Sequence, residues 1–519
     1  MKNKSLLFTA GVLVMILQAK AQPSFVADSI DAYITKGMAA WQVPGLAIAI
    51  VKDSKVVLQK GYGVTNITTN QKVDANTLFF IASNTKLFTG TALANLAYQK
   101  KINLNDKISK YYPSYKLYDK NSSDLVTIKD MLTHRIGTKT FQGDFTFWNT
   151  SLTRAQIMQR MQYLKPTAGF RDAYGYCNSC FMTAGEIIPK ATNASWEDYI
   201  TQTLLQPLQM TASHALSNNI ATRVTNIATP YTTSFTNTLQ PVPYDAWDNL
   251  APAASIVSNV ADMAHWLQFQ LDSGKYNGKQ IVPWPVLQAT RDMQISTGSR
   301  KSTFYPIQFR GYGLGVFMTD YAGKQLYWHT GGAAGMVSNV CFVPEANLGI
   351  VILTNNDNQN LFEALRYQIL DSYLGVPYVN RSQQQLTDFN TEMEAQVAQV
   401  NSWRDSVKLE MGKYTLSNKK LVKYVGNYNN QLYGGIKITQ TTNYLTITFS
   451  NHPNLTATLK PLSPTEWLLQ YSNIEFGIFK TQFETRKVMG ANKLPTYKTY
   501  ISIKANDFVE YDAYEFEKQ

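Results

Sequence analysis

Hydrophobic and polar residues alternate along the N-terminal part of the chain in ways that predict several elements. Apolar residues at helical spacing in Phe25–Trp41 predict an amphipathic helix. Two apolar runs follow at Gly45–Val51 and Lys55–Leu58, separated by the polar turn Lys52–Ser54. Neither run alternates strictly, but the turn and the β-branched residues predict a β-hairpin. The segment 84–98 is apolar nearly all round, which is typical of a buried helix.

The pattern changes further along the chain. From Asp130 to about residue 300 it predicts mostly helices and loops. Strands are expected again at three apolar runs, followed by a helix: Leu326–Trp328, Met336–Phe342, Leu348–Leu353 and helix Leu361–Leu374. This order predicts a mixed α/β unit with a long helical insertion. Its antiparallel sheet would draw strands from both ends of the segment and would be flanked by helices.

The C-terminal part has a third pattern. Gln383–Met411 is polar and helical and has few core residues, which indicates a connector. Beyond Leu421, short runs with a period of two lie between turn residues, which predicts a small antiparallel β-barrel or sandwich. We expect domain boundaries at 22–380 for the α/β domain, 381–415 for the connector and 416–519 for the β domain.

The first 21 residues are typical of a secretory signal peptide. Lys2 and Lys4 precede the apolar stretch Leu6–Leu17, and Ala19–Ala21 fits an A-x-A cleavage site. Spanning a bilayer takes about 20 apolar residues, so this stretch is too short for a stable membrane anchor. We expect cleavage after Ala21 and a periplasmic or secreted protein.

Composition and charge exclude some classes of function. Hydrophobic residues make up 44% of the 519 positions and aromatic residues 12%, which is enough for a large core and excludes a disordered chain. The net charge of +12 is spread over scattered lysines. Because no dense basic run occurs, we expect no nucleic-acid partner.

Two of the three cysteines form a C-x-x-C, Cys177 to Cys180. No thioredoxin-like βαβ pattern surrounds them, which favours two separate thiols over a redox pair. An exported location would nevertheless permit a local disulfide. None of the five histidines pairs with the cysteines at ligand spacing, so we expect no metal site, and no cofactor is indicated.

Candidate chemistry begins with Ser83-Asn84-Thr85-Lys86 at the start of the apolar helix. Residues i and i+3 share a helix face, so the Ser83 hydroxyl and the Lys86 amine can be neighbours. Burial would lower the pKa of Lys86 and let it accept the Ser83 proton. The alternative is an ordinary helix cap. A second match at Ser417–Lys420 lies in a polar stretch, which indicates that the spacing alone is weak support.

Two further motifs follow. In Tyr176-Cys177-Asn178, an extended backbone would point the phenol and the amide into one cleft, where they could move a proton and hold a carbonyl or an amine. His329-Thr330-Gly331-Gly332 follows the expected strand Leu326–Trp328. Its two glycines would let a substrate approach as an added strand, and His329 could orient Tyr176 or a substrate carboxylate. A plain glycine-rich turn is the alternative.

With these motifs in this order, the sequence resembles the serine β-lactamase and penicillin-binding-protein family, in the branch of class C β-lactamases, D-alanyl-D-alanine carboxypeptidases, D-aminopeptidases and related esterases. The resemblance covers about residues 25–376. Further matching stretches are Val43–Gly45, Phe80–Ser83, Thr127–His134, Gln206–Met210, Gly335–Met336 and Leu353–Asn355. Beyond about residue 421 the chain resembles a β domain often appended to such hydrolases, opening at Tyr424–Tyr428.

The resemblance implies a role for each motif. Ser83 would be the acylated nucleophile and Lys86 its base. Tyr176 would relay the proton to the leaving group, and Asn178 would bind both the substrate amide and Lys86. The backbone N–H groups of Ser83 and Gly332 would form the oxyanion hole.

The third motif would bind substrate through Thr330 and Gly331, while His329 stands where β-lactamases usually carry lysine. A neutral histidine binds a carboxylate less firmly than lysine does, which weakens the β-lactamase interpretation. His134 lies in an expected turn and is predicted to be a structural loop histidine and not a catalyst. The remaining histidines are expected to be structural or surface groups: His214, His265 and His452.

These observations predict an exported serine hydrolase that cleaves an amide or ester, with D-residue peptides favoured over small esters and β-lactams. A non-turnover penicillin-binding sensor is the alternative, and the C-terminal domain could bind cell-wall material. Several aromatic residues could line a substrate cleft, although core or lid positions are favoured for them: Tyr111, Tyr112, Phe145, Phe147, Trp148 and Trp247.

Overall fold

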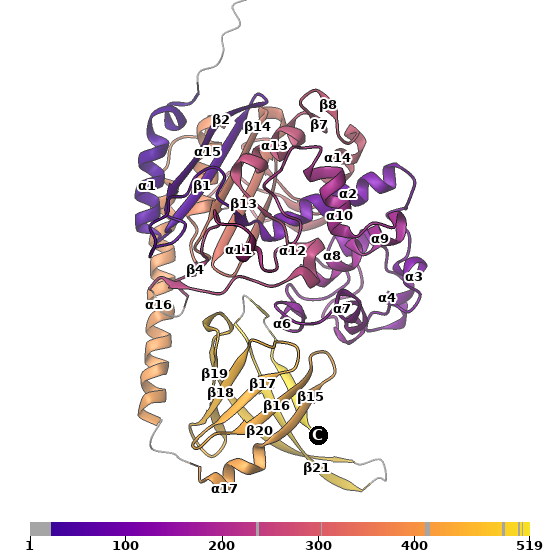
Figure 1. Cartoon of the computed structure of the whole chain (residues 1–519), viewed down its shortest axis with the longest axis vertical. Helices are drawn as coiled ribbons and strands as arrows, with labels where there is room; N and C mark the ends of the chain where they lie inside the picture. Colours follow the sequence, from indigo (N-terminus) through magenta and orange to yellow (C-terminus); the bar gives the residue numbers. More distant parts are fainter. Residues whose placement is uncertain are drawn as a thin grey trace, which may run out of the picture.

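A computed structural model describes residues 22–519 apart from 235–237, 303, 411–415, 490–493, 507–508 and 511 (Figure 1). The expected signal peptide, 1–21, lies outside the described residues. Within the described ranges, no helix is both long enough and apolar enough to cross a membrane.

An eight-stranded antiparallel sheet forms the centre of the first domain, in the order β2-β1-β14-β13-β12-β11-β10-β9. Its strands are β1 (Gly45–Lys52), β2 (Lys55–Gly63), β9 (Ile295–Gly298), β10 (Arg310–Tyr312), β11 (Phe317–Tyr321), β12 (Lys324–Ala333), β13 (Met336–Val343) and β14 (Leu348–Thr354). The N-terminal hairpin pairs with β14, with Ala49 opposite Val351. The sheet therefore takes strands from both ends of the domain, which confirms that prediction.

Helices cover both faces of this sheet, and this explains why β1 is apolar throughout. Ile48 and Ile50 belong to a core shared with η1 (Phe25–Ser29), α1 (Ile30–Ala40) and α15 (Leu361–Leu374). Ala47, Ala49 and Val51 face the larger core on the other side. A strand buried on both faces has no reason to alternate apolar and polar residues.

The segment between β2 and β9 is mainly helical, as the pattern predicted. Its helical elements are η2 (Ala82–Asn84), α2 (Thr85–Tyr98), α3 (Ile108–Tyr111), α4 (Lys120–Leu125), α5 (Ile128–Leu132), α6 (Asp144–Phe147), α7 (Arg154–Arg160), η3 (Met161–Tyr163), α8 (Asn178–Gly185), α9 (Ile187–Thr192), α10 (Trp196–Ile200), η4 (Thr201–Leu205), α11 (Ile220–Arg223), η5 (Asp248–Leu250), α12 (Ala251–Ala254), α13 (Val260–Leu271) and α14 (Trp284–Arg291). Three short strand pairs join them: β3 (Phe79–Phe80) with β6 (Val257–Ser258), β4 (Tyr231–Thr232) with β5 (Gln240–Pro241), and β7 (Lys275–Tyr276) with β8 (Lys279–Gln280).

The polar connector is the long helix α16 (Arg381–Glu410), which leads from the first domain toward a closed antiparallel barrel (Figure 1). The barrel consists of β15 (Gly426–Asn430), β16 (Gly434–Gln440), β17 (Leu445–Phe449), β18 (Thr456–Pro461), β19 (Glu466–Tyr471), β20 (Ile478–Met489), β21 (Pro495–Ile503) and β22 (Tyr514–Lys518). The helical turns α17 (Asn418–Leu421) and η7 (Val422–Tyr424) precede the barrel, and η8 (Ile474–Phe476) lies between β19 and β20. A further turn, η6 (Pro344–Ala346), joins β13 to β14 in the first domain. The sequence predicted either a barrel or a sandwich for the C-terminal domain, and the domain is a barrel. The exact domain boundaries stay predictions.

Candidate active site

Ser83 lies in the short turn η2, which runs directly into α2. Ala82, just before it, has a φ of 48°, a left-handed conformation that is uncommon for a residue with a Cβ atom. β12 approaches this turn so closely that a Cβ atom on Gly331 would lie 2.1 Å from the carbonyl oxygen of Ile81. Glycine at this position therefore allows β12 to lie beside the turn, and Ser83 and Gly332 line the same cavity.

Lys86 follows one helical turn later, and its side chain is completely buried. Its Nζ atom lies 3.0 Å from Ser83 Oγ, 2.7 Å from Asn178 Oδ1 and 3.0 Å from the carbonyl oxygen of Ala253. Burial holds the pKa of Lys86 well below its ordinary value, while the nearby Asp144 carboxyl acts in the opposite direction. The hydroxyl and the amine that the i, i+3 spacing predicted as neighbours do lie together.

Tyr176 and Asn178 reach the same cavity from the start of α8. Cys177, the N-cap, has the extended backbone that the sequence led us to expect, whereas Asn178 is already the first residue of the helix. Lys86 Nζ lies 4.5 Å from the centroid of the Tyr176 ring. Burial raises the pKa of the Tyr176 phenol, and the nearby Ser83 hydroxyl opposes this in part. Within the described part of the chain, the phenol oxygen has no hydrogen-bond partner.

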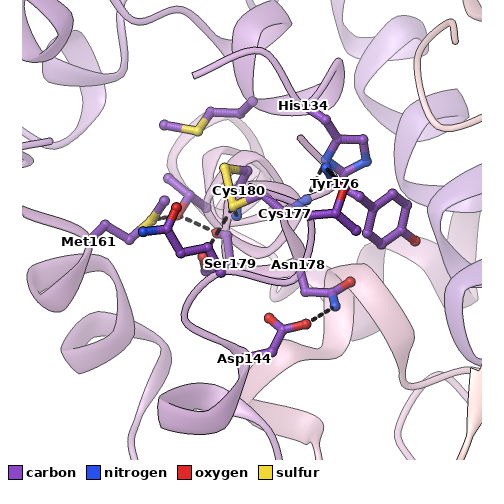
Figure 2. The surroundings of a disulfide bond; sticks show 12 residues. His134, Asp144, Met161, Tyr176, Cys177, Asn178, Ser179 and Cys180 are labelled. Carbon is purple, nitrogen blue, oxygen red and sulfur yellow. Dashed lines mark hydrogen bonds between the residues drawn. A yellow bond between two sulfur atoms is a disulfide. The ribbon is translucent and has the colours of Figure 1, made fainter. Parts of the chain in front are cut away.

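Cys177 and Cys180 form a disulfide, which corrects the expectation of two separate thiols (Figure 2). Cys177 is the N-cap of α8 and Cys180 lies in its first turn, so the start of the helix brings their Cα atoms to 5.3 Å. No thioredoxin-like surroundings are needed for this geometry. The third cysteine, Cys341, is buried as a free thiol.

His329 lies inside β12, which continues to Ala333, so the glycine-rich motif is strand and not a turn. Its Nδ1 atom lies 2.8 Å from the carbonyl oxygen of Thr330, and its Nε2 atom lies 3.3 Å from the Tyr312 hydroxyl. Burial lowers the pKa of His329 to about 3, with the nearby Lys86 as a smaller cause. His329 is therefore neutral near pH 7 and brings no positive charge to this position.

Tyr312 and His134 belong to the contacts around His329 and Tyr176. The sequence did not reveal this role for either residue. The Tyr312 hydroxyl also lies 3.3 Å from His134 Nε2, and His134 Nδ1 accepts the backbone N–H of Cys177 at 3.0 Å. The His134 ring stacks on Tyr176 with 4.4 Å between centroids, so this buried histidine is structural but supports the phenol directly. Glycines at 311, 313 and 315 flank Tyr312 and were the available signal of a close backbone approach.

Asp144 is a third residue that the sequence did not single out. Asn178 donates from Nδ2 to Asp144 Oδ2 at 2.7 Å, as the dashed line in Figure 2 shows. Burial raises the pKa of Asp144 to about 8, although the hydrogen bond from Asn178 opposes the shift. No local motif marks Asp144, because its partners come from distant parts of the chain.

Four of the catalytic candidates line a cavity of about 560 Å³: Ser83, Tyr176, Asn178 and His329. The buried Lys86 is not among the residues that line this cavity. Aromatic rings line much of it: Phe141, Trp148, Tyr174, Trp247, Phe317 and Trp328. Its acidic lining residues are Asp144, Asp357 and Glu363, and no lysine or arginine is among the described lining residues. Of the six aromatic residues considered from the sequence, only Trp148 and Trp247 reach the cavity.

The other aromatic and histidine residues considered from the sequence lie outside the cavity. Phe147 is buried in the core, and the hydroxyls of Tyr111 and Tyr112 bond to Asp106 and to the carbonyl of Glu186. The ring of His265 packs against Tyr276, while His214 is half-buried. In the described part of the chain, no cluster of three or more histidine, cysteine, aspartate or glutamate residues is arranged to hold a metal ion.

Comparison with known proteins places this site in a family. The model of the family described as Beta-lactamase matches residues 30–374. The chain belongs to the beta-lactamase family. This confirms the sequence-based assignment to the superfamily of serine hydrolases that includes the β-lactamases and penicillin-binding proteins.

Curated relatives and a solved structure are also similar. Protein flp of Staphylococcus aureus (strain MRSA252) is 32% identical over 354 residues, which is 66% of each chain, so this chain spans about two thirds of the length of that relative. Unguisins hydrolase ungD of Aspergillus violaceofuscus is 24% identical over 71% of this chain and 69% of its own. The octameric penicillin-binding protein homologue from Pyrococcus abyssi superimposes with a TM-score of 0.60 at 20% identity, covering 95% of this chain and all of that one, and shares the fold.

Proposed function

We propose that the protein is an exported serine hydrolase that cleaves an amide or ester through a covalent acyl-enzyme on Ser83. The observation that carries the proposal is the 3.0 Å separation between Ser83 Oγ and the buried Lys86 Nζ. A neutral amine has two N–H donors and one lone pair. The oxygens of Asn178 and Ala253 accept the two donors, which leaves the lone pair for the Ser83 proton.

The first half of the reaction follows from this arrangement. Ser83 Oγ attacks the substrate carbonyl while Lys86 accepts the hydroxyl proton. The backbone N–H groups of Ser83 and Gly332 stabilise the oxyanion. Tyr176, whose hydroxyl has no hydrogen-bond partner in the described structure, passes its proton to the leaving group as the carbonyl reforms, and the proton that Lys86 accepted replaces it. Water then attacks the ester on Ser83 and gives one proton to Lys86. That proton passes to Ser83 Oγ as the acid is released, so Ser83 and Lys86 return to their starting forms.

A D-residue peptide is the substrate class we favour, bound along β12 by Thr330 and Gly331. Because His329 is neutral and no cation lines the described cavity, the cavity suits a neutral or amine-bearing peptide better than a terminal carboxylate. This favours a D-peptidase over a carboxypeptidase. The name of the unguisins hydrolase relative supports hydrolysis by this family of proteins.

Other members of the superfamily suggest alternatives to a D-peptidase. Small esters and β-lactams react by the same acylation step, and a slow second step would leave a penicillin-binding sensor. The protein would work in the periplasm or outside the cell if residues 1–21 act as a signal peptide.

Cell-wall binding by the barrel is a secondary proposal. The exposed side chains of Met489 and Tyr497, on strands β20 and β21, favour it. Retention of the full chain on purified peptidoglycan, and its loss in Tyr497→Ala, would be the expected result. Equal retention of both proteins, or of neither, would contradict it.

A substrate panel tests the proposed function. Turnover of a p-nitrophenyl ester, a cephalosporin and a D-alanyl anilide should show steady hydrolysis of the anilide and none by Ser83→Ala. Steady hydrolysis of the ester alone would favour an esterase. A single burst without further turnover would favour a sensor.

A further inference from the structure

The single-turn helix α6 lies between the barrel and α8, the helix that begins at Asn178 (Figure 1). Phe145, on this helix, is buried among aromatic rings at one end of the barrel. The ring centroids within 6.5 Å of it belong to Tyr433, Phe449, His452, Tyr471, Phe476 and Tyr514. A side chain of the first domain therefore occupies the barrel mouth.

Polar groups of the C-terminal domain hold both ends of α6. Glu510 accepts the backbone N–H of Gly143 at 3.0 Å and that of Phe145 at 3.2 Å. Helix N-termini need acceptors for such groups, and α6 has no side-chain cap of its own. Just beyond its other end, His452 Nε2 lies 3.0 Å from the carbonyl oxygen of Trp148. The barrel thus supplies the cap that the helix sequence lacks.

The opposite side of α6 faces the catalytic candidates. Asp144 is the neighbour of Phe145 in sequence, and its carboxylate accepts the Asn178 amide at 2.7 Å. The oxygen of the same amide accepts from Lys86 at 2.7 Å. A continuous series of contacts therefore leads from Glu510 to the amine beside Ser83. A single helical turn has little stability alone, so its position depends on what packs against it.

We propose that the C-terminal barrel completes the active site by holding α6, so that Asp144 fixes the Asn178 amide against Lys86. Glu510, Phe145 and Asp144 are positioning residues in this account, because none of them is assigned a bond to the reacting atoms. The inference rests on the proposed role of Ser83 and Lys86. Loss of the barrel contacts lets the Asn178 amide turn away, and Lys86 then loses its orientation toward Ser83.

The rate of Ser83 acylation by a fluorophosphonate, measured on the full chain from pH 5 to 9, tests this proposal. Displacing a catalytic group by about 1 Å costs about a hundredfold in rate, so we expect Glu510→Ala and Asp144→Ala, each of which removes its acceptor, to be acylated roughly 10- to 100-fold more slowly. In Asp144→Ala the pH at which acylation rises should also move lower, because no carboxyl remains at this position to support the charged form of Lys86. A role in folding alone would not shift this profile.

Glu517→Ala is the matched control, since Glu517 lies on β22 and pairs with Lys498 on the outer surface of the barrel. Its acylation rate and pH profile should equal those of the wild type. Glu510→Gln keeps one acceptor oxygen and should react at an intermediate rate, which tests the proposal if the alanine variant does not fold.

The double variant Glu510→Ala/Asp144→Ala separates a shared effect from two independent ones. If Glu510 acts through Asp144, the double variant should be no slower than the slower single variant. If the two losses in acylation rate multiply in the double variant, or if the single variants react like the wild type, the proposal is overturned. Failure of the wild-type Ser83 to react at all would instead overturn the proposed function.

Discussion

Lys86 and Asp144 bind opposite ends of one amide, that of Asn178, each at a distance of 2.7 Å. Both ionisable side chains are buried, which lowers the pKa of Lys86 and raises the pKa of Asp144 to about 8. Burial thus favours the neutral form of each group near pH 7. A neutral Lys86 is the form that can accept a proton from Ser83.

Removing either proposed proton-transfer group should slow the reaction without unfolding the protein. We expect Lys86→Ala and Tyr176→Phe to lower kcat/KM by a factor of about 10² to 10⁴, because each removes a group that moves a proton in the transition state. Steady-state kinetics with the preferred substrate measure this. Tyr497→Phe, at an exposed barrel position, should keep the wild-type rate on a soluble substrate. A loss below tenfold in Lys86→Ala would contradict the assigned base.

The charge on the substrate should affect binding in a predictable direction. The described cavity lining has acidic residues and no lysine or arginine, and His329 is neutral. A D-alanyl peptide with an amidated C-terminus should therefore have a lower KM than the same peptide with a free carboxylate, by about tenfold. Paired kinetics on the two peptides test this, and a preference for the free acid would indicate an unrecognised cation.

The domain contact at Glu510 should weaken as the pH rises. Burial raises the pKa of this carboxyl to about 7 from its ordinary 4.5. Protonated Glu510 makes its full contribution to the free energy of unfolding below pH 4.5. This contribution is lost as the pH rises through 7, because the Glu510 carboxyl ionises at a lower pH in the unfolded chain than in the folded one. We expect the free energy of unfolding of the wild type to fall relative to Glu510→Gln between pH 4.5 and 8, by up to about 3 kcal/mol. Denaturant titrations at several pH values measure the difference, and parallel curves would contradict it.

Reduction of the disulfide should have a modest effect on stability and a local effect on the site. The bridge closes a loop with a sequence separation of 3, so we expect its loss to cost about 2 kcal/mol. Cys177 lies between Tyr176 and Asn178, and acylation should slow as well. Thermal unfolding and fluorophosphonate kinetics with and without dithiothreitol test both effects. Cys177→Ser/Cys180→Ser should show the same losses and no response to the reductant.

Local patterns in the sequence were enough to predict much of the fold. The hairpin, the buried helix after Ser83 and the helix Leu361–Leu374 follow from hydrophobic spacing and turn residues, which are short-range signals. The S-x-x-K spacing also placed Ser83 beside Lys86, because one helical turn fixes that distance.

Long-range contacts could not be predicted in the same way. Asp144 and Tyr312 lie in the site because separate elements pack around it. The glycines beside Tyr312 indicate only a close backbone approach, and no neighbouring residue marks Asp144. The contact between Phe145 and the barrel likewise depends on how two domains meet. The disulfide was misjudged because the sequence did not show that Cys177 caps a helix and Cys180 lies in its first turn.

The central claim is that Ser83 is a nucleophile activated by Lys86. Intact-mass measurement after incubation with a fluorophosphonate, followed by peptide mapping, tests it most directly. We expect one adduct per chain, located on Ser83, with none in Ser83→Ala and much slower labelling in Lys86→Ala. Labelling that persists in Ser83→Ala, or a wild-type protein that stays unmodified, would contradict the account.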